Sequence, residues 1–96
     1  MTFKYQLAFK ASALKEWQKL GPVIRTQFKK KLQQRLQQPY VPADALSGMK
    51  DCYKIKLRSA GYRLVYMVED DIVTVTVVAV GKRERGDVYS RAHERL

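Results

Sequence analysis

The chain has very few of the residues from which many catalytic sites are built. Its 96 residues include one histidine, His93, and one cysteine, Cys52. A single histidine excludes a pair of histidines acting as acid and base, and a single cysteine excludes an internal disulfide bond. The sequence also contains no spacing typical of a metal site, no glycine-rich phosphate loop and no nucleophile elbow. It therefore argues against a nucleotide-using or metal-dependent enzyme, and we expect no metal and no cofactor.

Long apolar runs are also missing. The longest, Ile72 to Val80, includes two threonines and is far too short to cross a bilayer. Residues 1–10 alternate charged and apolar positions and do not form the unbroken apolar core of a signal peptide. Because no disulfide points to an oxidising compartment, we expect a cytoplasmic protein that does not enter a membrane.

Acidic residues are scarce relative to basic ones. Nine Asp and Glu stand against nineteen Lys and Arg, which gives a formal net charge of +10. Such a balance suits a polyanionic partner: nucleic acid first, an anionic membrane surface second and an acidic protein third. A hydrophobic fraction of 46% is ordinary for a globular chain, and the length predicts one domain over residues 1–96.

The segment from Asp51 to Val68 carries the clearest pattern in the chain. Two runs of alternating apolar and polar residues flank the turn Arg58–Gly61, which predicts a β-hairpin with one buried face. Because the turn has an even number of residues, alternate positions of the two strands should share faces. The buried face is predicted to hold Tyr53, Ile55, Leu57, Tyr62, Leu64 and Tyr66. The opposite face should then gather Lys54, Lys56 and Arg63.

The rest of the chain completes an α+β domain. Alternation over residues 2–9 predicts an N-terminal strand, and helical spacing predicts an α-hairpin of residues 12–20 and 22–38, with Ser12 as the first N-cap. We expect this hairpin to return the chain to the end of the sheet that it left, so that the next strand runs antiparallel to the first. Ile72–Val80 should be a central strand and residues 85–96 a short C-terminal helix. The sheet would have four strands in all, the last three of them a three-stranded antiparallel meander.

Two groups of charged residues have more than one interpretation. Five cations without an acid lie on the second predicted helix: Arg25, Lys29, Lys30, Lys31 and Arg35. They could follow an RNA backbone or form a solvated helix face, and the sequence favours neither. Three consecutive acids, Glu69 to Asp71, could suggest a metal site, but a solvated turn is the simpler interpretation because no other ligands accompany them.

Lysine, arginine and tyrosine are the residues that remain for chemistry. Lys54, Lys56 and Arg63 share a face, and Arg83 and Tyr89 follow the last strand, with Lys82 and Arg85 as further candidates for RNA contacts. Crowded cations lower one another's pKa, which can bring a lysine toward proton transfer, while arginine stays charged and clamps a phosphoryl group. Phosphodiester cleavage without metal or histidine could be built from these parts. A cationic face that merely binds RNA or an acidic protein would show the same pattern.

Three blocks of sequence resemble a known family. DCYKIKLRSAGYRLVY (51–66), VGKRERGDVYSRA (80–92) and ALKEW (13–17) resemble the RelE branch of the RelE/ParE toxin superfamily, and the resemblance covers essentially the whole chain. It implies a toxin of a bacterial toxin–antitoxin pair that cleaves mRNA in the ribosomal A site, contacts 16S rRNA and is neutralised by a RelB-like antitoxin. Attack of a 2′-hydroxyl on the adjacent phosphorus would leave a 2′,3′-cyclic phosphate and a 5′-hydroxyl.

The resemblance also implies roles for single residues. Lys54 and Lys56 look like the pair that transfers the proton and supplies charge, and we favour Lys54 as the base because it lies farther from the turn. Arg63 and Arg83 resemble the arginines that stabilise the pentavalent phosphorane and the leaving group, and Tyr89 resembles the residue that stacks on the substrate nucleotide. The alternatives are a ParE-like toxin, whose branch targets DNA gyrase and lacks this constellation, and a non-catalytic RNA-binding module.

Overall fold

The computed structural model describes residues 4–84 and 86–96, so Thr2 and Phe3 of the predicted first strand lie outside the described residues. In chain order the elements are β1 (Gln6–Phe9), α1 (Ala11–Gln18), α2 (Pro22–Gln37), β2 (Cys52–Leu57), β3 (Tyr62–Glu69), β4 (Thr74–Lys82) and α3 (Asp87–Glu94). Short 3-10 turns occupy Pro42–Asp44 and Asp70–Ile72. No helix in the described part of the chain is both long and apolar enough to span a membrane.

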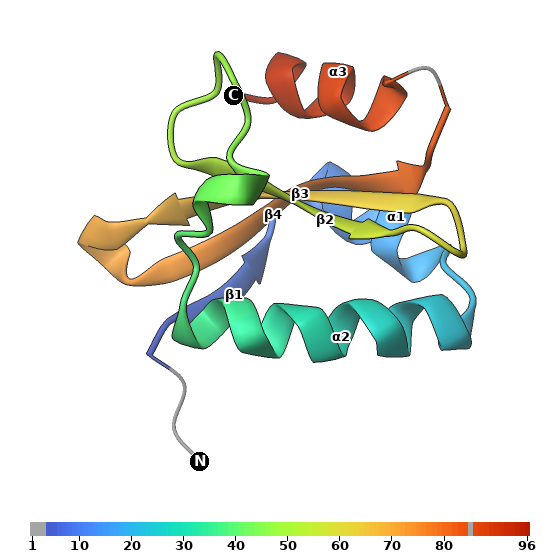
Figure 1. Ribbon diagram of the computed structural model, residues 1–96, viewed down its shortest axis with the longest axis horizontal. Coiled ribbons are helices and arrows are strands. Elements are labelled where there is room, and N and C mark those ends of the chain that lie inside the picture. Colours follow the sequence, from blue (N-terminus) through green and yellow to red (C-terminus); the bar gives the residue numbers. More distant parts are fainter. Residues whose placement is uncertain (1–3, 85) are drawn as a thin grey trace.

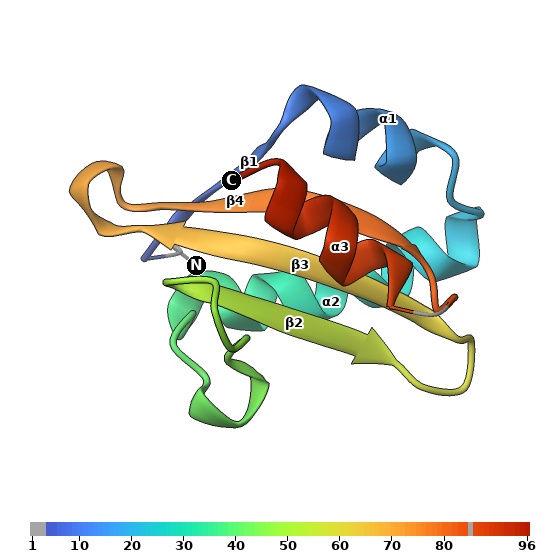
Figure 2. The same ribbon diagram turned by 90° about the horizontal axis from the view of Figure 1, so that it is seen from above.

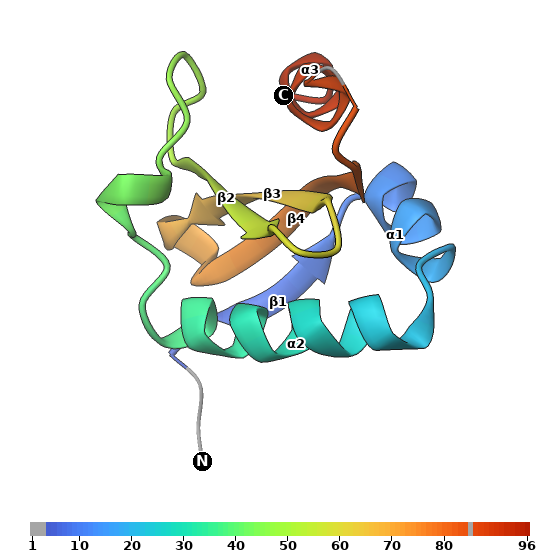
Figure 3. The same cartoon turned by 45° about the vertical axis from the view of Figure 1, so that its right-hand side comes forward.

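The four strands form one mixed sheet in the order β1-β4-β3-β2. As predicted, β2, β3 and β4 make an antiparallel meander, and β4 is a central strand between β1 and β3. Helix α2 covers one face of the sheet and α3 lies on the other (Figures 1 and 3). Helix α1 packs beside β4, as the view from above shows (Figure 2). The two faces of the sheet are named below by the helix that covers each, the α2 face and the α3 face.

The register of the central hairpin confirms the prediction from its four-residue turn. Tyr53 pairs with Tyr66, Ile55 with Leu64 and Leu57 with Tyr62. These six side chains belong to the α2 face, where they pack as core residues or against the core. Lys56 lies directly opposite Arg63, so both project to the α3 face, as does Lys54. Alternation together with an even turn was therefore enough to place the cations.

The predicted direction of the strand after the helical hairpin was wrong. β1 runs parallel to β4, and β2 runs the same way because β3 reverses direction between them. The cause is the unequal length of the two helices, 8 residues in α1 and 16 in α2. At 1.5 Å per residue α2 is about 12 Å longer, so it carries the chain back past the whole of β1. Its end meets the start of β1, where Tyr5 N–H donates to the Leu36 carbonyl at 2.9 Å.

The first helix also begins earlier than predicted, with its N-cap two residues before Ser12. Lys10 is the N-cap, without a side-chain hydrogen bond, and the helix starts at Ala11. Lys10 N–H donates to the Val77 carbonyl at 3.0 Å as the last bond between β1 and β4. The same residue's carbonyl accepts from Leu14 N–H at 2.9 Å, which is the first helical bond. The strand thus passes directly into the helix, which leaves no turn for a serine cap.

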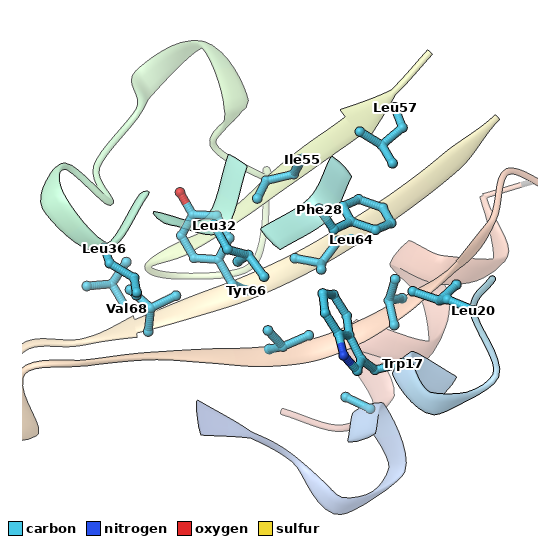
Figure 4. Close-up of a cluster of buried hydrophobic side chains, with 14 of the residues drawn as sticks. Trp17, Leu20, Phe28, Leu32, Leu36, Ile55, Leu57, Leu64, Tyr66 and Val68 are labelled. Atoms are coloured by element: carbon cyan, nitrogen blue, oxygen red, sulfur yellow. The ribbon is translucent and has the colours of Figure 1, made fainter. Parts of the chain in front are cut away.

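The main hydrophobic core lies on the α2 face. Phe28, Leu32 and Leu36 of α2 are buried against the apolar side chains of β2 and β3, and Trp17 of α1 closes one end (Figure 4). The Trp17 ring lies 6.2 Å from the Phe28 ring, centroid to centroid. A smaller cluster on the α3 face consists of Cys52, Val65, Val78, Ala79, Val88 and Ala92. The two faces therefore differ in the size of the side chains that they bury.

Candidate active site

A pocket of about 170 Å³ lies on the α3 face, where the end of β2 and the start of β3 meet the start of α3. Its lining residues are Lys56, Arg63, Arg83, Glu84, Gly86, Asp87, Val88 and Tyr89. Four of the five residues predicted to be catalytic are among them, although they come from four separate segments. The fifth, Lys54, projects from the same face as Lys56 but does not line the pocket.

Backbone pairing places the three cations of the pocket. Arg63 on β3 lies opposite Lys56 on β2, and opposed positions of an antiparallel pair have Cβ atoms roughly 4.5–5.5 Å apart. Beyond the end of β4, Arg83 N–H donates to the carbonyl of Gly61 at 2.7 Å, which ties Arg83 to the hairpin turn. Arg63 Nη1 donates to the carbonyl of Tyr62 at 3.2 Å. The backbone thus gathers positive charge that the side chains would not gather on their own.

Electrostatics single out Lys56 among the lysines. Its pKa is lowered, chiefly by the positive charge of Lys54, then by partial desolvation and by the charges of Arg63 and Arg58. The more distant Asp44 works weakly in the opposite direction. A lowered pKa means that a larger fraction of Lys56 is in the free-base form near neutral pH than for an isolated lysine. Lys56 is therefore the lysine that is both in the pocket and shifted toward proton acceptance.

Tyr89 brings an aromatic ring to the pocket from the first turn of α3. Its neighbour Val88 and the next-turn residue Ala92 are buried against the sheet, which turns the Tyr89 ring toward the pocket. The Tyr89 hydroxyl is buried, and no hydrogen-bond partner for it occurs among the residues that the structure describes. The described part of the protein therefore leaves this buried polar group unsatisfied, which is uncommon for a structural tyrosine.

Two acidic residues of the pocket were missed by the sequence analysis. Glu84 and Asp87 line it beside the cations, and Asp87 pairs with Arg91 at 3.2 Å within α3. Their signal was available, because both flank Arg85 in the block that carries the family resemblance, and Asp87 and Arg91 have the i, i+4 spacing of a helical ion pair. Their two negative charges offset part of the positive charge of Lys56, Arg63 and Arg83, so the pocket keeps a smaller net positive charge.

Arg35, predicted to contact RNA, is instead part of the α2-face structure. Its guanidinium pairs with Asp44 at 2.6 Å, donates to the Tyr66 hydroxyl at 2.9 Å and reaches the Lys54 carbonyl at 3.4 Å. The Tyr66 hydroxyl in turn donates to the carbonyl of Pro39 at 2.7 Å. The side chain of Arg35 is only 14% exposed. With its donors used inside the protein, Arg35 is not free to follow a phosphate backbone, so we withdraw that assignment.

The other predicted RNA contacts do not form one surface. Successive helical residues turn by about 100°, so the exposed Lys29, Lys30 and Lys31 point to three different sides of α2. Lys31 shares a groove with Lys56 and Arg58 beside the hairpin, whereas α2 as a whole lies on the face of the sheet opposite α3 (Figure 1). The remaining candidates are the half-buried Arg25, the exposed Lys82, which lines a separate groove, and Arg85, which lies outside the described residues.

The acidic turn after β3 has a structural use. The Asp70 carboxylate accepts hydrogen bonds from the hydroxyls of Tyr5 at 2.7 Å and Tyr40 at 2.5 Å, and these bonds hold its pKa below the ordinary range. It thereby joins the start of β1 to the loop after α2. Across residues 4–84 and 86–96, no group of three or more His, Cys, Asp and Glu side chains is placed to hold a metal ion.

The pocket has the groups that phosphodiester chemistry requires. Fixed guanidinium groups stabilise charge that grows on phosphoryl oxygens, and a lysine with a lowered pKa accepts a proton. An aromatic ring such as that of Tyr89 can stack on a nucleobase, whatever the base. The residues together suit a single-stranded nucleic acid with one phosphate seated between Lys56, Arg63 and Arg83.

Comparisons with known proteins cover nearly the whole chain. The family model described as the ParE toxin of the type II toxin-antitoxin system, parDE, matches residues 7–86. The mRNA interferase toxin RelE of Escherichia coli K12 is 59% identical over 92 residues, which cover 96% of this chain and 97% of that protein. Among solved structures, a mutant of E. coli toxin RelE in the free state has a TM-score of 0.89 at 56% identity, covering 97% of this chain and 98% of that one. A chain of the intact E. coli RelBE toxin-antitoxin complex has a TM-score of 0.81 at 59% identity, covering 84% and 99%.

Proposed function

This chain belongs to the RelE branch of the RelE/ParE toxins, and we propose that it is a ribosome-dependent endoribonuclease that cleaves mRNA in the ribosomal A site and so inhibits translation. The observation that carries the proposal is the convergence of Lys56, Arg63, Arg83 and Tyr89 on one pocket. The relative named mRNA interferase toxin RelE supports it, with 59% identity along nearly the whole chain.

The reaction is a transesterification within the RNA. A base removes the proton of a 2′-hydroxyl, the 2′-oxygen forms a bond to the adjacent phosphorus, and the bond from phosphorus to the 5′-oxygen breaks. The products are a 2′,3′-cyclic phosphate and a 5′-hydroxyl, whose proton comes from solvent. Arg63 and Arg83 offset the charge that develops on the phosphorane and on the departing oxygen. Tyr89 stacks on a base next to the scissile bond and holds it in line.

Lys56 is our candidate for the base, in place of Lys54, which the sequence favoured. Lys56 lines the pocket, and its pKa is lowered mainly by the charge of Lys54. Two residues along a strand separate the two lysines by about 6–7 Å, so only one of them reaches a given 2′-hydroxyl. Lys54 then acts on the reaction through Lys56 and through its charge.

The surroundings of the pocket fit a target inside the ribosome. The net charge of +10 attracts an RNA surface over a distance, and Lys31 and Arg58 extend the positive charge outward from Lys56 along one groove. Contacts with 16S rRNA would come from such cations, and the site of action would be the cytoplasm. The cognate antitoxin would be a RelB-like protein with acidic segments, in keeping with the RelBE complex of E. coli.

The test is to incubate the purified chain with mRNA-programmed ribosomes and to map the cleaved ends. We expect cuts in the A-site codon with a 2′,3′-cyclic phosphate on one side and a 5′-hydroxyl on the other, and far slower cleavage of the same mRNA without ribosomes. An intact message together with inhibition of DNA gyrase would instead give the chain the activity of the ParE branch. An intact message with ribosome binding alone would reduce it to an RNA-binding module.

A further inference from the structure

Part of the β4 edge has no neighbouring strand. β1 pairs with β4 only between Thr74 and Val77, and Lys10 then turns away into α1. A β-bulge follows, because Val65 pairs with Ala79 and Tyr66 with Val77, which leaves Val78 as the extra residue of β4. The backbone of Val78 and Val80 consequently faces the edge that β1 has left. Backbone groups at an open edge need partners, or they invite another strand.

Three charged side chains supply those partners. Glu16 of α1 accepts a hydrogen bond from Val80 N–H at 3.3 Å, and Arg95 Nη1 donates to the Val78 carbonyl at 2.9 Å. Arg91 Nη2 reaches the Val80 carbonyl at 3.5 Å. We call Glu16, Arg91 and Arg95 the edge clamp. Glu16 lies on α1, and both arginines lie on α3 or at its end. The clamp therefore joins the first helix to the last, and Glu16 and Arg95 are 79 residues apart in sequence.

The members of the edge clamp also bind one another. Arg95 makes two bonds to the Glu16 carboxylate, at 2.8 and 3.1 Å, and Arg91 Nε lies 3.3 Å from it. Burial alone would raise the pKa of Glu16. The hydrogen bonds from Arg95 and Val80 and the charges of both arginines outweigh burial and lower the pKa. Their side chains are 19–31% exposed, so solvent and salt weaken these pairs less than pairs on an open surface.

The clamp is adjacent to the pocket. Arg91 lies directly over Gly81, where a Cβ atom would come within 2.6 Å of its Nη2. Gly81 is the cross-strand partner of Arg63, one of the cations of the pocket. A side chain at position 81 would push Arg91 away, so glycine is needed there for the guanidinium to reach the edge of β4.

Helix α3 depends on this attachment. It has only eight residues, far fewer than an isolated helix needs to be stable in water, and the residues that it buries are Val88 and Ala92. Two small apolar side chains allow the helix to slide or rotate, whereas the bonds of Arg91 and Arg95 are directional. Tyr89 lies two residues before Arg91 on the same helix, so the position of its ring follows from the position of the helix.

We propose that Glu16 is a positioning residue of the cleavage site: through Arg91 and Arg95 it holds α3 where Tyr89 lies in the pocket. This inference rests on the proposed function of the pocket. It assigns a role to a residue of α1 that does not touch the pocket and would not contact the RNA. Loss of the Glu16 charge should lower the rate of the bound complex and leave ribosome binding unchanged.

The central variant is Glu16→Gln, which keeps the size of the side chain and an acceptor for Val80 N–H but removes the charge. Glu94→Gln, on the exposed surface of α3, is the matched control for loss of an acid. We expect Glu16→Gln to lower kcat on programmed ribosomes roughly tenfold or more, because misplacement of a substrate-orienting group by about 1 Å has effects of this size. KM should stay within about twofold, and Glu94→Gln should behave as the unaltered protein on both counts.

A second measurement separates positioning from general support of the fold. In a Tyr89→Ala background, Glu16→Gln should cause no further loss of kcat, because Glu16 acts through Tyr89. Losses that multiply, or an unchanged kcat in Glu16→Gln, would overturn the inference. If Glu16→Gln does not fold, Arg95→Lys, which keeps the charge but gives up the paired donors, should show a smaller loss of kcat with the same dependence on Tyr89. An unchanged kcat in Arg95→Lys would overturn the inference in that case.

Hydrogen exchange of the free protein tests whether the edge clamp holds α3 without any measurement of cleavage. The amides of residues 88–94 should exchange about tenfold faster or more in Glu16→Gln, while those of β3 and β4 keep their protection. If the unaltered chain did not cleave mRNA, the proposed function would fail, and this exchange would still decide whether the clamp holds α3. Unchanged exchange at residues 88–94 would overturn the clamp itself.

Discussion

The two faces of the sheet are built for different purposes. The α2 face buries large side chains, among them Phe28, Leu32 and Tyr66, and the partly buried Arg35 on this face is paired with Asp44 and Tyr66. The α3 face buries valines, alanines and a cysteine, and it places Lys56 directly opposite Arg63. Like charges in opposed positions of a sheet are destabilising. Stability therefore comes mainly from one face, and the other gives up some stability for a concentrated positive charge.

The fold can hold a cluster of like charges because the core on the other face of the same strands fixes their positions. Side chains of a strand alternate between the faces, so the same two strands of the hairpin serve both purposes. Ile55 and Leu64 fix the register from the α2 face, and that register decides which cations meet on the α3 face. A site of like charges cannot hold itself together, and here the opposite face of the same strands supplies the restraint.

The largest loss of stability should come from Phe28→Ala on the α2 face. Phe28 is completely buried on the α2 face, and removal of such a ring costs roughly 3–5 kcal/mol of unfolding free energy. Val88→Ala, its counterpart on the α3 face, should cost less, because fewer buried atoms are lost. Urea unfolding of both variants is the measurement. An equal or larger loss of unfolding free energy in Val88→Ala would show that the α2 face does not supply most of the stability.

Arg83→Ala should lower the rate of cleavage and leave stability unchanged. Arg83 is exposed and lines the pocket, so the free energy of unfolding should hardly change. Loss of one preorganised donor typically lowers a rate roughly 10²–10³-fold, and we expect a drop of that size in single-turnover cleavage on the ribosome. Ribosome affinity should remain, since many other cations supply it. Weaker binding with a normal rate in the bound complex would make Arg83 an anchor only.

Arg35→Gln tests the corrected assignment of a cation to the α2 face. The change removes charged hydrogen bonds to Asp44 and Tyr66 and should cost about 1–3 kcal/mol of unfolding free energy. Lys30→Gln, an exposed change of charge on the same helix, is the control and should leave stability unchanged. The salt dependence of ribosome binding should not respond to Arg35→Gln. A flatter salt dependence with full stability would restore Arg35 to the RNA contacts.

The smallest expected effect is a gain in stability, in Arg63→Gln. Arg63→Gln removes one of two opposed like charges and should raise the free energy of unfolding by about 0.2–1 kcal/mol, while cleavage falls. Thermal or urea unfolding gives the first quantity and single-turnover cleavage the second. Reduced stability would mean that Arg63 supports the fold. Repulsion between Lys56 and Arg63 would then not be a cost to stability on the α3 face.

Much of this arrangement could be predicted from the sequence. Tyr53, Ile55 and Leu57 alternate with Lys54 and Lys56, and alternation is a local property that the folded strand preserves. The four-residue turn then fixed the partner of each residue. The cluster of cations was predicted for this reason, and the family resemblance pointed to the same residues.

What the sequence could not supply depended on contacts between distant segments. The direction of β2 relative to β1 follows from how far α2 extends along the sheet, and Ser12 lost its predicted role because β1 ends on a bond to Val77. Arg35 has the sequence signature of a surface cation, but Asp44 and Tyr66 enclose it. Glu16 and Arg95 meet across most of the chain, so no local pattern indicates that they are partners.

The central claim is that the α3 face carries the chemistry, with Lys56 as the base, and the pH dependence of single-turnover cleavage tests it most directly. The rate should rise with pH up to the pKa of the base and level off below the ordinary lysine value of about 10.4, because the charge of Lys54 lowers the pKa of Lys56. Arginine keeps the positive charge but does not release a proton near neutral pH. Lys56→Arg should therefore lose most of the rate together with the rising limb, and Lys54→Arg should keep both in part. A lost limb in Lys54→Arg alone, or equal losses with an unchanged limb in both variants, would contradict the account.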